Sequence, residues 1–142
     1  MGAVVIKDGD HNMDFHRVRE MLAKSFWVPD ISFDEIIKGT KNSALVVGAF
    51  IDGQQIGYAR VISDKTRFAY ILDVYVSEDH RRKKIGRSMI QYILTHNELK
   101  DVYQWLLITK DAHGVYSPLG FAPVSRPFDW LEIRKQRHMV RE

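Results

Sequence analysis

Cysteine is absent from the 142-residue chain. A chain without thiols cannot be a disulfide scaffold, hold a thiolate zinc site or use a cysteine nucleophile. Long apolar runs are absent too, because the longest candidate, residues 44–51, falls far short of the roughly 20 residues of a membrane span. The N-terminus lacks a basic stretch followed by an apolar core, so no signal peptide is expected. Together these absences favour a cytoplasmic protein without a membrane partner.

The composition is that of an ordinary globular protein. Hydrophobic residues make up 45% of the chain and charged residues 27%, which is enough to build and solvate a core. No repeat, low-complexity segment or linker interrupts the sequence. We therefore expect a single domain over residues 1–142.

The positive charge is small and concentrated. The formal net charge is +3, but five basic residues fall within residues 81–87, and without them 16 basic residues face 18 acidic ones. Residues 134–142 form a basic tail with four more positive charges, to which the sequence assigns no role. An acidic body with one cationic spot argues against a nucleic-acid partner and favours a compact anionic ligand.

Strand patterns occupy the first half of the chain. A short strand is expected over residues 3–7, and a β-rich run over 44–51 is followed by Asp52-Gly53 and another over 54–63, which predicts a hairpin. Residues 68–76 form the strongest strand pattern in the chain.

Helix patterns separate these strands. Apolar residues recur at helical spacing over residues 13–26, with Asn12 as the expected N-cap. Ser32 and Glu35 form a capping-box pattern that opens a short helix ending near Gly39. An amphipathic helix is expected over residues 85–96.

The C-terminal third alternates between the two kinds of element. It predicts a strand over residues 103–109, a short helix over 111–116 and a last strand over 121–124. The resulting fold class is α/β (α+β), with a mixed, mostly antiparallel central sheet flanked by helices.

The strand over residues 68–76 contains one unusual residue. Strict alternation places Asp73 on the face opposite Tyr70, Val74 and Val76, and both faces are mostly apolar, as in a central strand. A carboxylate in such a strand needs a partner or a function. Arg60 on the neighbouring strand is one candidate partner, and a catalytic role is the alternative.

The segment after this strand is a candidate anion site. A central strand runs into a cationic loop, and Gly86 then falls in the first turn of a helix. Free amides and the positive end of the helix dipole attract anions there, and glycine permits close approach to the backbone. The spacing is neither that of a Walker A loop nor G-x-G-x-x-G.

Arg81-Arg82-Lys83-Lys84-Ile85-Gly86 leads into the predicted helix, and the run Thr109-Lys-Asp-Ala-His-Gly-Val-Tyr116 lies downstream. The downstream run resembles a subset of small proteins of the GNAT superfamily of N-acetyltransferases whose acceptors are mostly unassigned. The first segment resembles that family's acetyl-coenzyme A loop, Arg/Gln-x-x-Gly-x-Gly/Ala, with Lys84 at the middle glycine. That departure fits only if the backbone of Lys84 does not need a positive φ. Downstream, Tyr116-Ser-Pro-Leu-Gly120-Phe121 matches the family's Tyr-x-x-x-Gly-Phe.

The resemblance implies acetyl-coenzyme A as co-substrate and no metal. The pantetheine arm would pair with the backbone of residues 74 and 76, and amides of residues 82–88 would take the pyrophosphate. The implied donor-site residues are Val74, Val76, Arg81, Arg82, Lys83, Lys84, Ile85, Gly86, Arg87 and Ser88. Tyr116 matches the tyrosine that protonates the departing thiolate.

The base and the acceptor site are less defined. Many family members use a strand glutamate as base, and that position holds Tyr70 here. Asp73, His113 or water remain as alternatives. The acceptor pocket is expected to include Trp27, Arg60, Tyr70 and His113.

The sequence therefore predicts an N-acetyltransferase that moves an acetyl group directly to a primary amine in a ternary complex. The acceptor is a small-molecule or peptide amine whose identity stays open, as does a homodimer. A non-catalytic coenzyme A sensor of the same fold is the alternative.

Overall fold

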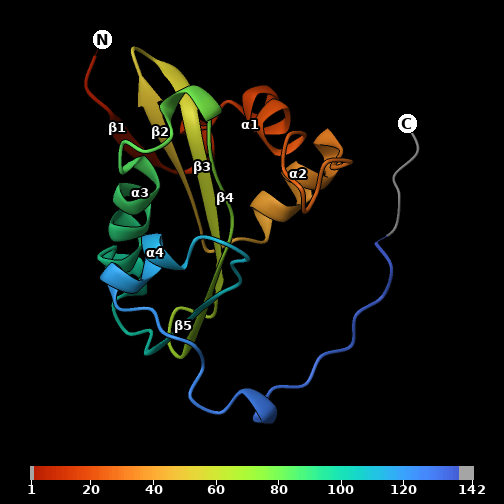
Figure 1. Cartoon of the computed structure of the whole chain (residues 1–142). Helices are drawn as coiled ribbons and strands as arrows, with labels where there is room; N and C mark the ends of the chain where they lie inside the picture. The colour runs from red at the N-terminus through yellow and green to blue at the C-terminus, as the bar shows by residue number, and fades with distance from the viewer. Residues whose placement is uncertain (1, 138–142) are drawn as a thin grey trace.

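Five strands lie side by side in the order of the chain in a computed structural model that describes residues 2–137 (Figure 1). The strands are β1 (Val5–Asp8), β2 (Leu45–Ile51), β3 (Gln54–Ser63), β4 (Phe68–Val76) and β5 (Gln104–Leu107). Neighbours from β1 to β4 are antiparallel, whereas β5 runs parallel to β4. The prediction of a mixed, mostly antiparallel sheet flanked by helices is confirmed.

Helices cover both faces of this sheet. The helices α1 (Phe15–Leu22) and α2 (Phe33–Lys41) lie on one face, and α3 (Ile85–Leu94) lies on the other. The short α4 (His113–Tyr116) packs against α3. None of the helices within residues 2–137 is long and apolar enough to cross a membrane.

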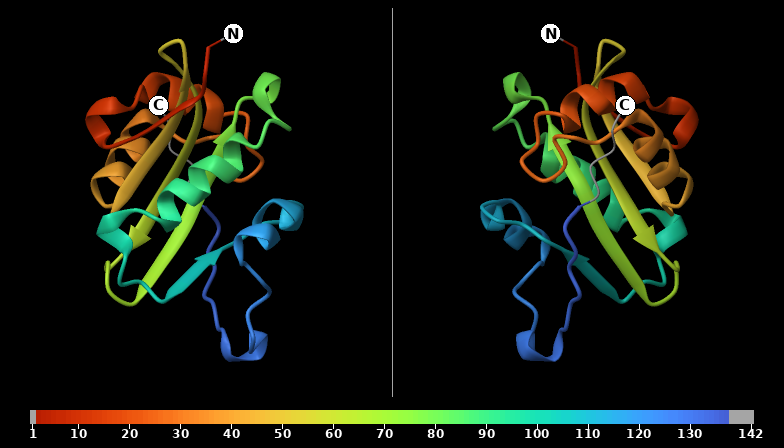
Figure 2. Two further views of the ribbon diagram at one scale, coloured as in Figure 1. Left: turned by 90° about the vertical axis from the view of Figure 1, so that its left-hand side faces the viewer. Right: turned by 90° about the vertical axis from the view of Figure 1, so that its right-hand side faces the viewer.

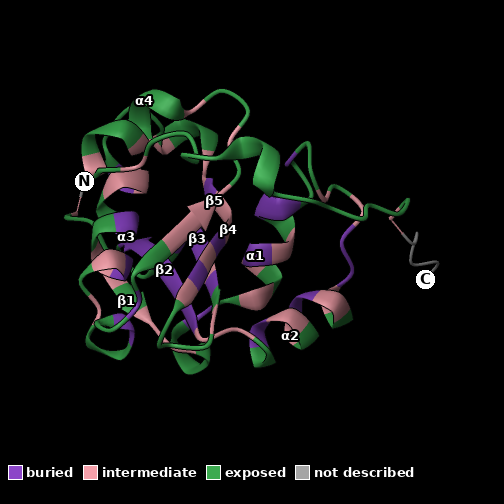
Figure 3. Ribbon diagram, turned by 90° about the horizontal axis from the view of Figure 1, so that it is seen from below, coloured by how far each residue is buried: buried purple, intermediate pink, exposed green. Residues whose placement is uncertain are grey.

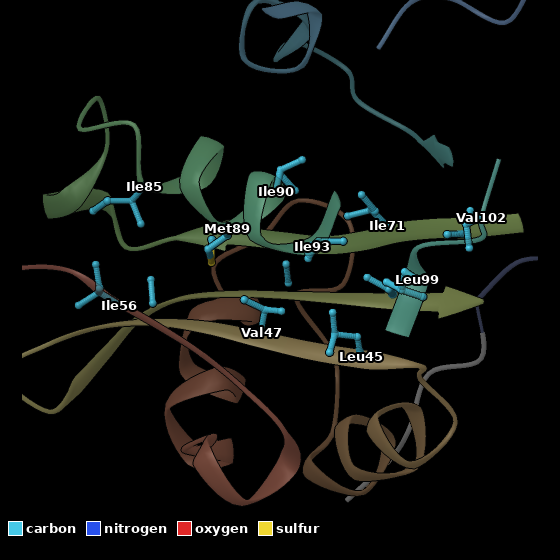
Figure 4. Packing of buried hydrophobic residues seen from close by; sticks show 14 of the residues in the cluster. Leu45, Val47, Ile56, Ile71, Ile85, Met89, Ile90, Ile93, Leu99 and Val102 are labelled. Carbon is cyan, nitrogen blue, oxygen red and sulfur yellow. The ribbon is translucent and has the colours of Figure 1, made fainter. Parts of the chain in front are cut away.

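The larger core lies between α3 and the sheet (Figure 4). Ile85, Met89, Ile90 and Ile93 form the apolar stripe of α3, and each is at most 3% exposed. Burial of such a side chain is worth about 2 kcal/mol. This packing holds the N-terminus of α3 rigidly beside the end of β4.

The helix starts follow local capping chemistry. The Asp14 carboxylate caps α1 by accepting a hydrogen bond from the Arg17 amide at 3.1 Å, so the prediction of Asn12 as N-cap is wrong. Asn12 lies instead in the short 3₁₀ helix η1 (Asp10–Asn12). Ser32 caps α2 as predicted, with its hydroxyl 3.1 Å from the Glu35 amide. The helix continues past Gly39 to Lys41, because an internal glycine weakens a packed helix without ending it.

The predicted strand over residues 121–124 is wrong. Those residues begin an irregular segment that contains the 3₁₀ helix η5 (Pro127–Asp129). We call residues 121–137 the arm. A cavity of about 740 Å³ lies between β5 and the start of the arm. The end of the basic tail, residues 138–142, lies outside the described residues.

Candidate active site

The site is built where β4 separates from β5. Their parallel pairing starts at Phe68 and ends at Ile71 opposite Leu107, although β4 continues to Val76. Beyond Ile71, β4 has no strand partner on that side within residues 2–137. The backbone of residues 72–76 is therefore open toward the space between the two strands.

A β-bulge shapes this part of β4. Asp73 and Val74 together lie opposite Ala59, because Tyr58 pairs with Tyr75 whereas Arg60 pairs with Leu72. Asp73 adopts a left-handed backbone with φ of 56°, a conformation that Asp and Asn accept more readily than most residues.

The bulge shifts the alternation of side chains, so the predicted alternation along β4 is wrong beyond Leu72. Ile71 packs in the core beside α3, but after the bulge Val74 and Val76 pack there as well. Tyr75 joins the core beside α1 and α2. The extra residue thereby brings Asp73 into the same cavity as Tyr70, not onto the opposite face.

Each carboxylate oxygen of Asp73 accepts a hydrogen bond. Arg60 Nε donates to Oδ2 at 2.8 Å, and Trp27 Nε1 donates to Oδ1 at 3.0 Å. The Asp73 side chain is only 7% exposed. The predicted pairing with Arg60 is confirmed, and it explains how a central strand tolerates this carboxylate.

A cavity of about 850 Å³ opens on the α1 and α2 face around this group. Tyr116 lines the same cavity, so the structure brings most of the predicted acceptor and catalytic side chains together. Those that line it are Trp27, Arg60, Tyr70, Asp73, Val74 and Tyr116. His113 is not among the lining residues; it lies exposed at the start of α4.

Three phenols line this cavity and are protonated at neutral pH, and burial raises the pKa of the first, Tyr58, to about 12. Burial raises the pKa of Tyr116 above its usual value of 10. Burial, followed by the negative charge of Asp73, also raises the pKa of Tyr70. Each hydroxyl can therefore act as a proton or hydrogen-bond donor throughout the neutral range.

The cationic loop makes a second, smaller cavity of about 390 Å³ at the N-terminus of α3. Ser88 N donates to Lys84 O at 3.0 Å as the first helical hydrogen bond, so the amides of residues 84–87 have no acceptor within the helix. An added Cβ at Gly86 would meet only Val76 Cγ2, at 3.8 Å. Free amides beside an uncrowded backbone suit a phosphate group.

The sequence analysis requires a Lys84 backbone without positive φ, and the structure does not meet this requirement. Lys84 adopts φ of 62° and Arg82 φ of 65°, both in the left-handed region. Each costs about 1–2 kcal/mol for a residue with a side chain. Lys84 thus adopts a backbone conformation that glycine adopts easily. The loop therefore holds backbone strain at a candidate ligand site.

The basic side chains of the loop have different roles. Arg81 Nε donates to Val76 O at 2.9 Å, and its guanidinium lies over the Tyr75 ring at 5.1 Å, so Arg81 ties the loop to the end of β4. The other predicted donor residues that line the smaller cavity are Val76, Arg82, Lys84, Ile85, Gly86 and Arg87. Lys83 and Ser88 are exposed and do not line it.

The sequence interpretation missed residues that the arm and α2 bring to the larger cavity. Arg137 Nε lies 3.0 Å from Asp30 Oδ1, and its Nη2 lies 2.7 Å from Glu35 Oε1. Arg134, Arg137, Lys38 and Glu35 all line the cavity. More than 100 residues separate Arg137 from its partners, so only the basic composition of the tail hinted at a role.

Within residues 2–137, no group of three or more His, Asp or Glu side chains is arranged to hold an ion. Two cavities lie along β4: Val76 lines the one with free amides, and Val74 lines the one with paired charges and phenols.

Solved structures of other proteins share this fold. A GNAT-family protein from Xanthomonas campestris pv. campestris is 30% identical, with 95% of each chain covered and a TM-score of 0.88. A Clostridium acetobutylicum acetyltransferase solved with acetyl-CoA is 15% identical, covers 93% of this chain and 96% of its own, and has a TM-score of 0.70. Glucosamine-6-phosphate N-acetyltransferase from Arabidopsis thaliana is 17% identical, with 94% of this chain and 98% of its own chain covered and a TM-score of 0.68.

No curated protein matches the sequence. A family model does match it: residues 15–121 fit the acetyltransferase (GNAT) family, a span that includes both motifs, the bulged strand and most of the residues that line the two cavities. With most of its length inside that match, this chain belongs to the acetyltransferase (GNAT) family.

Proposed function

We propose that this chain is a single-domain N-acetyltransferase that moves an acetyl group from acetyl-coenzyme A directly to a primary amine. The observation that carries the proposal is that β4 contributes to two cavities two residues apart. Val76 lines the cavity with the free amides, and Val74 lines the one with Tyr116 and Asp73. A donor anchored by its phosphates at the N-terminus of α3 would reach the acceptor cavity along the open edge of β4.

The donor site fits coenzyme A in charge and in shape. The amides of residues 84–87 would take the pyrophosphate, with Arg82, Lys84 and Arg87 adding positive charge around it. The edge of residues 72–76 that faces away from β3 would hold the pantetheine arm as an added strand. A structural neighbour that contains acetyl-CoA supports this assignment.

Transfer then needs one bond to form and one to break. The amine nitrogen attacks the thioester carbonyl carbon, the C–S bond breaks, and the sulfur takes a proton from the Tyr116 hydroxyl. The raised pKa of Tyr116 keeps that proton in place until the thiolate forms. Because the thiolate is partly desolvated in the same cavity, its own basicity rises as well.

The amine must lose its proton, and Asp73 is placed to orient it. His113 lies outside the cavity, whereas the Asp73 carboxylate lines it. Arg60 and Trp27 occupy one lone pair on each Asp73 oxygen, and a carboxylate oxygen accepts more than one hydrogen bond. In our proposal, an ammonium substrate first loses a proton to water in the open cavity, and Asp73 then binds the neutral amine. The nitrogen loses another proton as the amide forms, and water passes that proton to the Tyr116 phenolate.

The protein lacks cysteine, so no acetyl-cysteine intermediate can form. Our proposal is direct transfer, with both substrates bound at once. Initial rates measured against both substrates should therefore give intersecting lines, not the parallel lines of a ping-pong enzyme.

An amine panel with thiol detection tests this function. Alkylamines, diamines, amino acids, amino sugars, aminoglycosides and lysine peptides are each incubated with acetyl-coenzyme A and enzyme. At least one class should release coenzyme A thiol together with an equal amount of N-acetylated product. The cysteine-free protein adds no thiol background. Donor binding without thiol release for any amine would instead favour the coenzyme A sensor.

A further inference from the structure

The larger cavity has more basic than acidic side chains in its walls. The basic lining residues are Lys38, Arg60, Lys110, Arg134 and Arg137, and the acidic ones are Glu35, Asp73 and Asp111. This excess gives a positive potential to the space where the acceptor would bind. A polycationic amine would be repelled there, whereas an amine that also carries an anionic group would be attracted.

Two of the basic residues are already paired within the fold. Arg60 donates to the Asp73 carboxylate at 2.8 Å. Arg137 contacts Asp30 at 3.0 Å and Glu35 through both of its terminal nitrogens. These two guanidinium groups therefore hold elements of the fold together, and other basic residues must supply the positive potential.

The remaining charges in the cavity are unpaired. Within residues 2–137, no ion pair forms at Lys38, Lys110 or Arg134, and Asp111 likewise has no basic partner. The Lys110 ammonium lies over the Phe26 ring at 5.4 Å. Arg134 on the arm and Lys38 on α2 are thus the basic lining groups, among the described residues, that a ligand's anion could pair with.

Arg134 lies near the Tyr70 end of the cavity. Burial, followed by the charge of Asp73, raises the pKa of Tyr70, whereas the positive charge of Arg134 lowers it. A charge shifts a pKa in this way only from nearby. On β4, Tyr70 precedes Asp73 by three residues, at most about 10 Å along a strand, and lies on the side away from Val76 and the cationic loop.

The arm is anchored where it carries Arg134. It runs from the β5 end of the sheet toward α2 (Figure 2), and nearly all of it is exposed (Figure 3). Three residues beyond Arg134, the Arg137 side chain fixes the arm to Asp30 and Glu35. Because the backbone near Arg134 is already held, binding an anion there costs less ordering than it would on a free chain end.

Apolar side chains line much of the same cavity. Phe26, Ile62 and Ile108 are lining residues, and all of them are exposed. Exposed apolar groups gathered around a cavity with a few polar side chains are typical of a small-molecule site. A ligand with an apolar middle section would cover them.

We propose that the acceptor is an amine joined through a short apolar chain to a carboxylate or a phosphate. The amine lies at Asp73, and the anion lies at the Tyr70 end, where the Arg134 guanidinium and the Tyr70 hydroxyl donate to it. The planar fork of an arginine matches carboxylate and phosphate oxygens alike. The inference rests on the proposed function for the role of the amine, whereas the anion site can bind without any reaction.

Matched acceptors that differ only in the anion test this inference. The pairs are ε-aminocaproate with its amide, and aminopentyl phosphate with aminopentanol. In at least one pair the anionic amine should have a kcat/KM about tenfold or more above that of its neutral partner, and the larger ratio identifies the anion. Ratios near one in both pairs would overturn the anion site and leave the acetyltransferase function standing.

Arg134→Gln should bring this ratio close to one, because a neutral side chain cannot compensate the charge of the anion. Lys135→Gln is the matched control: it removes the same charge from the next residue of the arm, and Lys135 is exposed and does not line the cavity. The control should keep the wild-type ratio. An equal loss in both variants would assign the preference to the overall charge of the arm and refute a site at Arg134.

A binding measurement separates this inference from the proposed function if no amine releases thiol. The acetylated forms of the four amines are titrated by calorimetry into the protein saturated with coenzyme A. The anionic form of at least one pair should bind about tenfold more tightly than its neutral partner, in wild type and in Lys135→Gln but not in Arg134→Gln. Equal affinities within both pairs, or no binding of any form, would overturn the anion site whether or not acetyl transfer occurs.

Discussion

Replacement of Tyr116 by phenylalanine should lower kcat by about 100-fold, the usual loss when a general acid is removed. Tyr116 is the only ionisable group that lies on the α4 wall of the acceptor cavity. Without its hydroxyl, the thiolate would have to leave unprotonated or wait for water. Because phenylalanine keeps the edge-to-face contact with Phe121, folding and acetyl-coenzyme A affinity should be unchanged.

Steady-state kinetics at saturating donor measure this effect. Tyr103→Phe is the matched control, since it removes an exposed hydroxyl that contacts only the Arg67 side chain. That variant should keep its kcat. Since burial raises the pKa of Tyr116, wild-type kcat should not fall through loss of this proton until the pH exceeds 10. A kcat within twofold of wild type in Tyr116→Phe would make Tyr116 a wall residue.

Replacement of Asp73 by asparagine should destabilise the fold by about 3 kcal/mol, because it leaves the half-buried Arg60 guanidinium without its counter-charge. Asparagine accepts the left-handed backbone at this bulge, so the effect reports the lost charge and not new strain. The KM for the amine should rise more than the KM for acetyl-coenzyme A, because Asp73 also orients Trp27 on the acceptor side.

Urea unfolding and two-substrate kinetics measure the two parts of this prediction. Asp111→Asn is the control, because Asp111 lines the same cavity but is exposed. Its stability should change by less than about 0.5 kcal/mol. If Asp73→Asn unfolded at the wild-type urea concentration, the ion pair with Arg60 would contribute nothing measurable to the free energy of unfolding, as is common for surface pairs.

Much of the fold follows from local patterns in the sequence. The stripe of Ile85, Met89, Ile90 and Ile93 predicted α3, and Asp52-Gly53 predicted the hairpin of β2 and β3. Ser32 predicted the start of α2 through a hydrogen bond to Glu35, only three residues further along the chain. Such signals depend on neighbours in the chain, so a single sequence contains them.

The candidate site was predicted less completely, because its decisive features are not local. A bulge adds one residue to β4 opposite Ala59, and nothing in the run of β formers marks where alternation is broken. The position of the C-terminal segment depends on the ion pairs of Arg137 with Asp30 and Glu35, which are distant in sequence. Lys84 shows a third limit: a residue that disfavours positive φ adopts it when the surrounding loop requires it.

The most direct test of the account is the thermal stability of the protein during titration with acetyl-coenzyme A. At about one hundred times Kd, binding should stabilise the fold by about 2.7 kcal/mol and raise Tm by roughly 8 °C. Gly86→Glu has room in the unliganded protein and should keep its Tm, but its carboxylate would repel the pyrophosphate and abolish the shift. An unmoved wild-type Tm, or an equal shift in Gly86→Glu, would contradict a donor site at the N-terminus of α3.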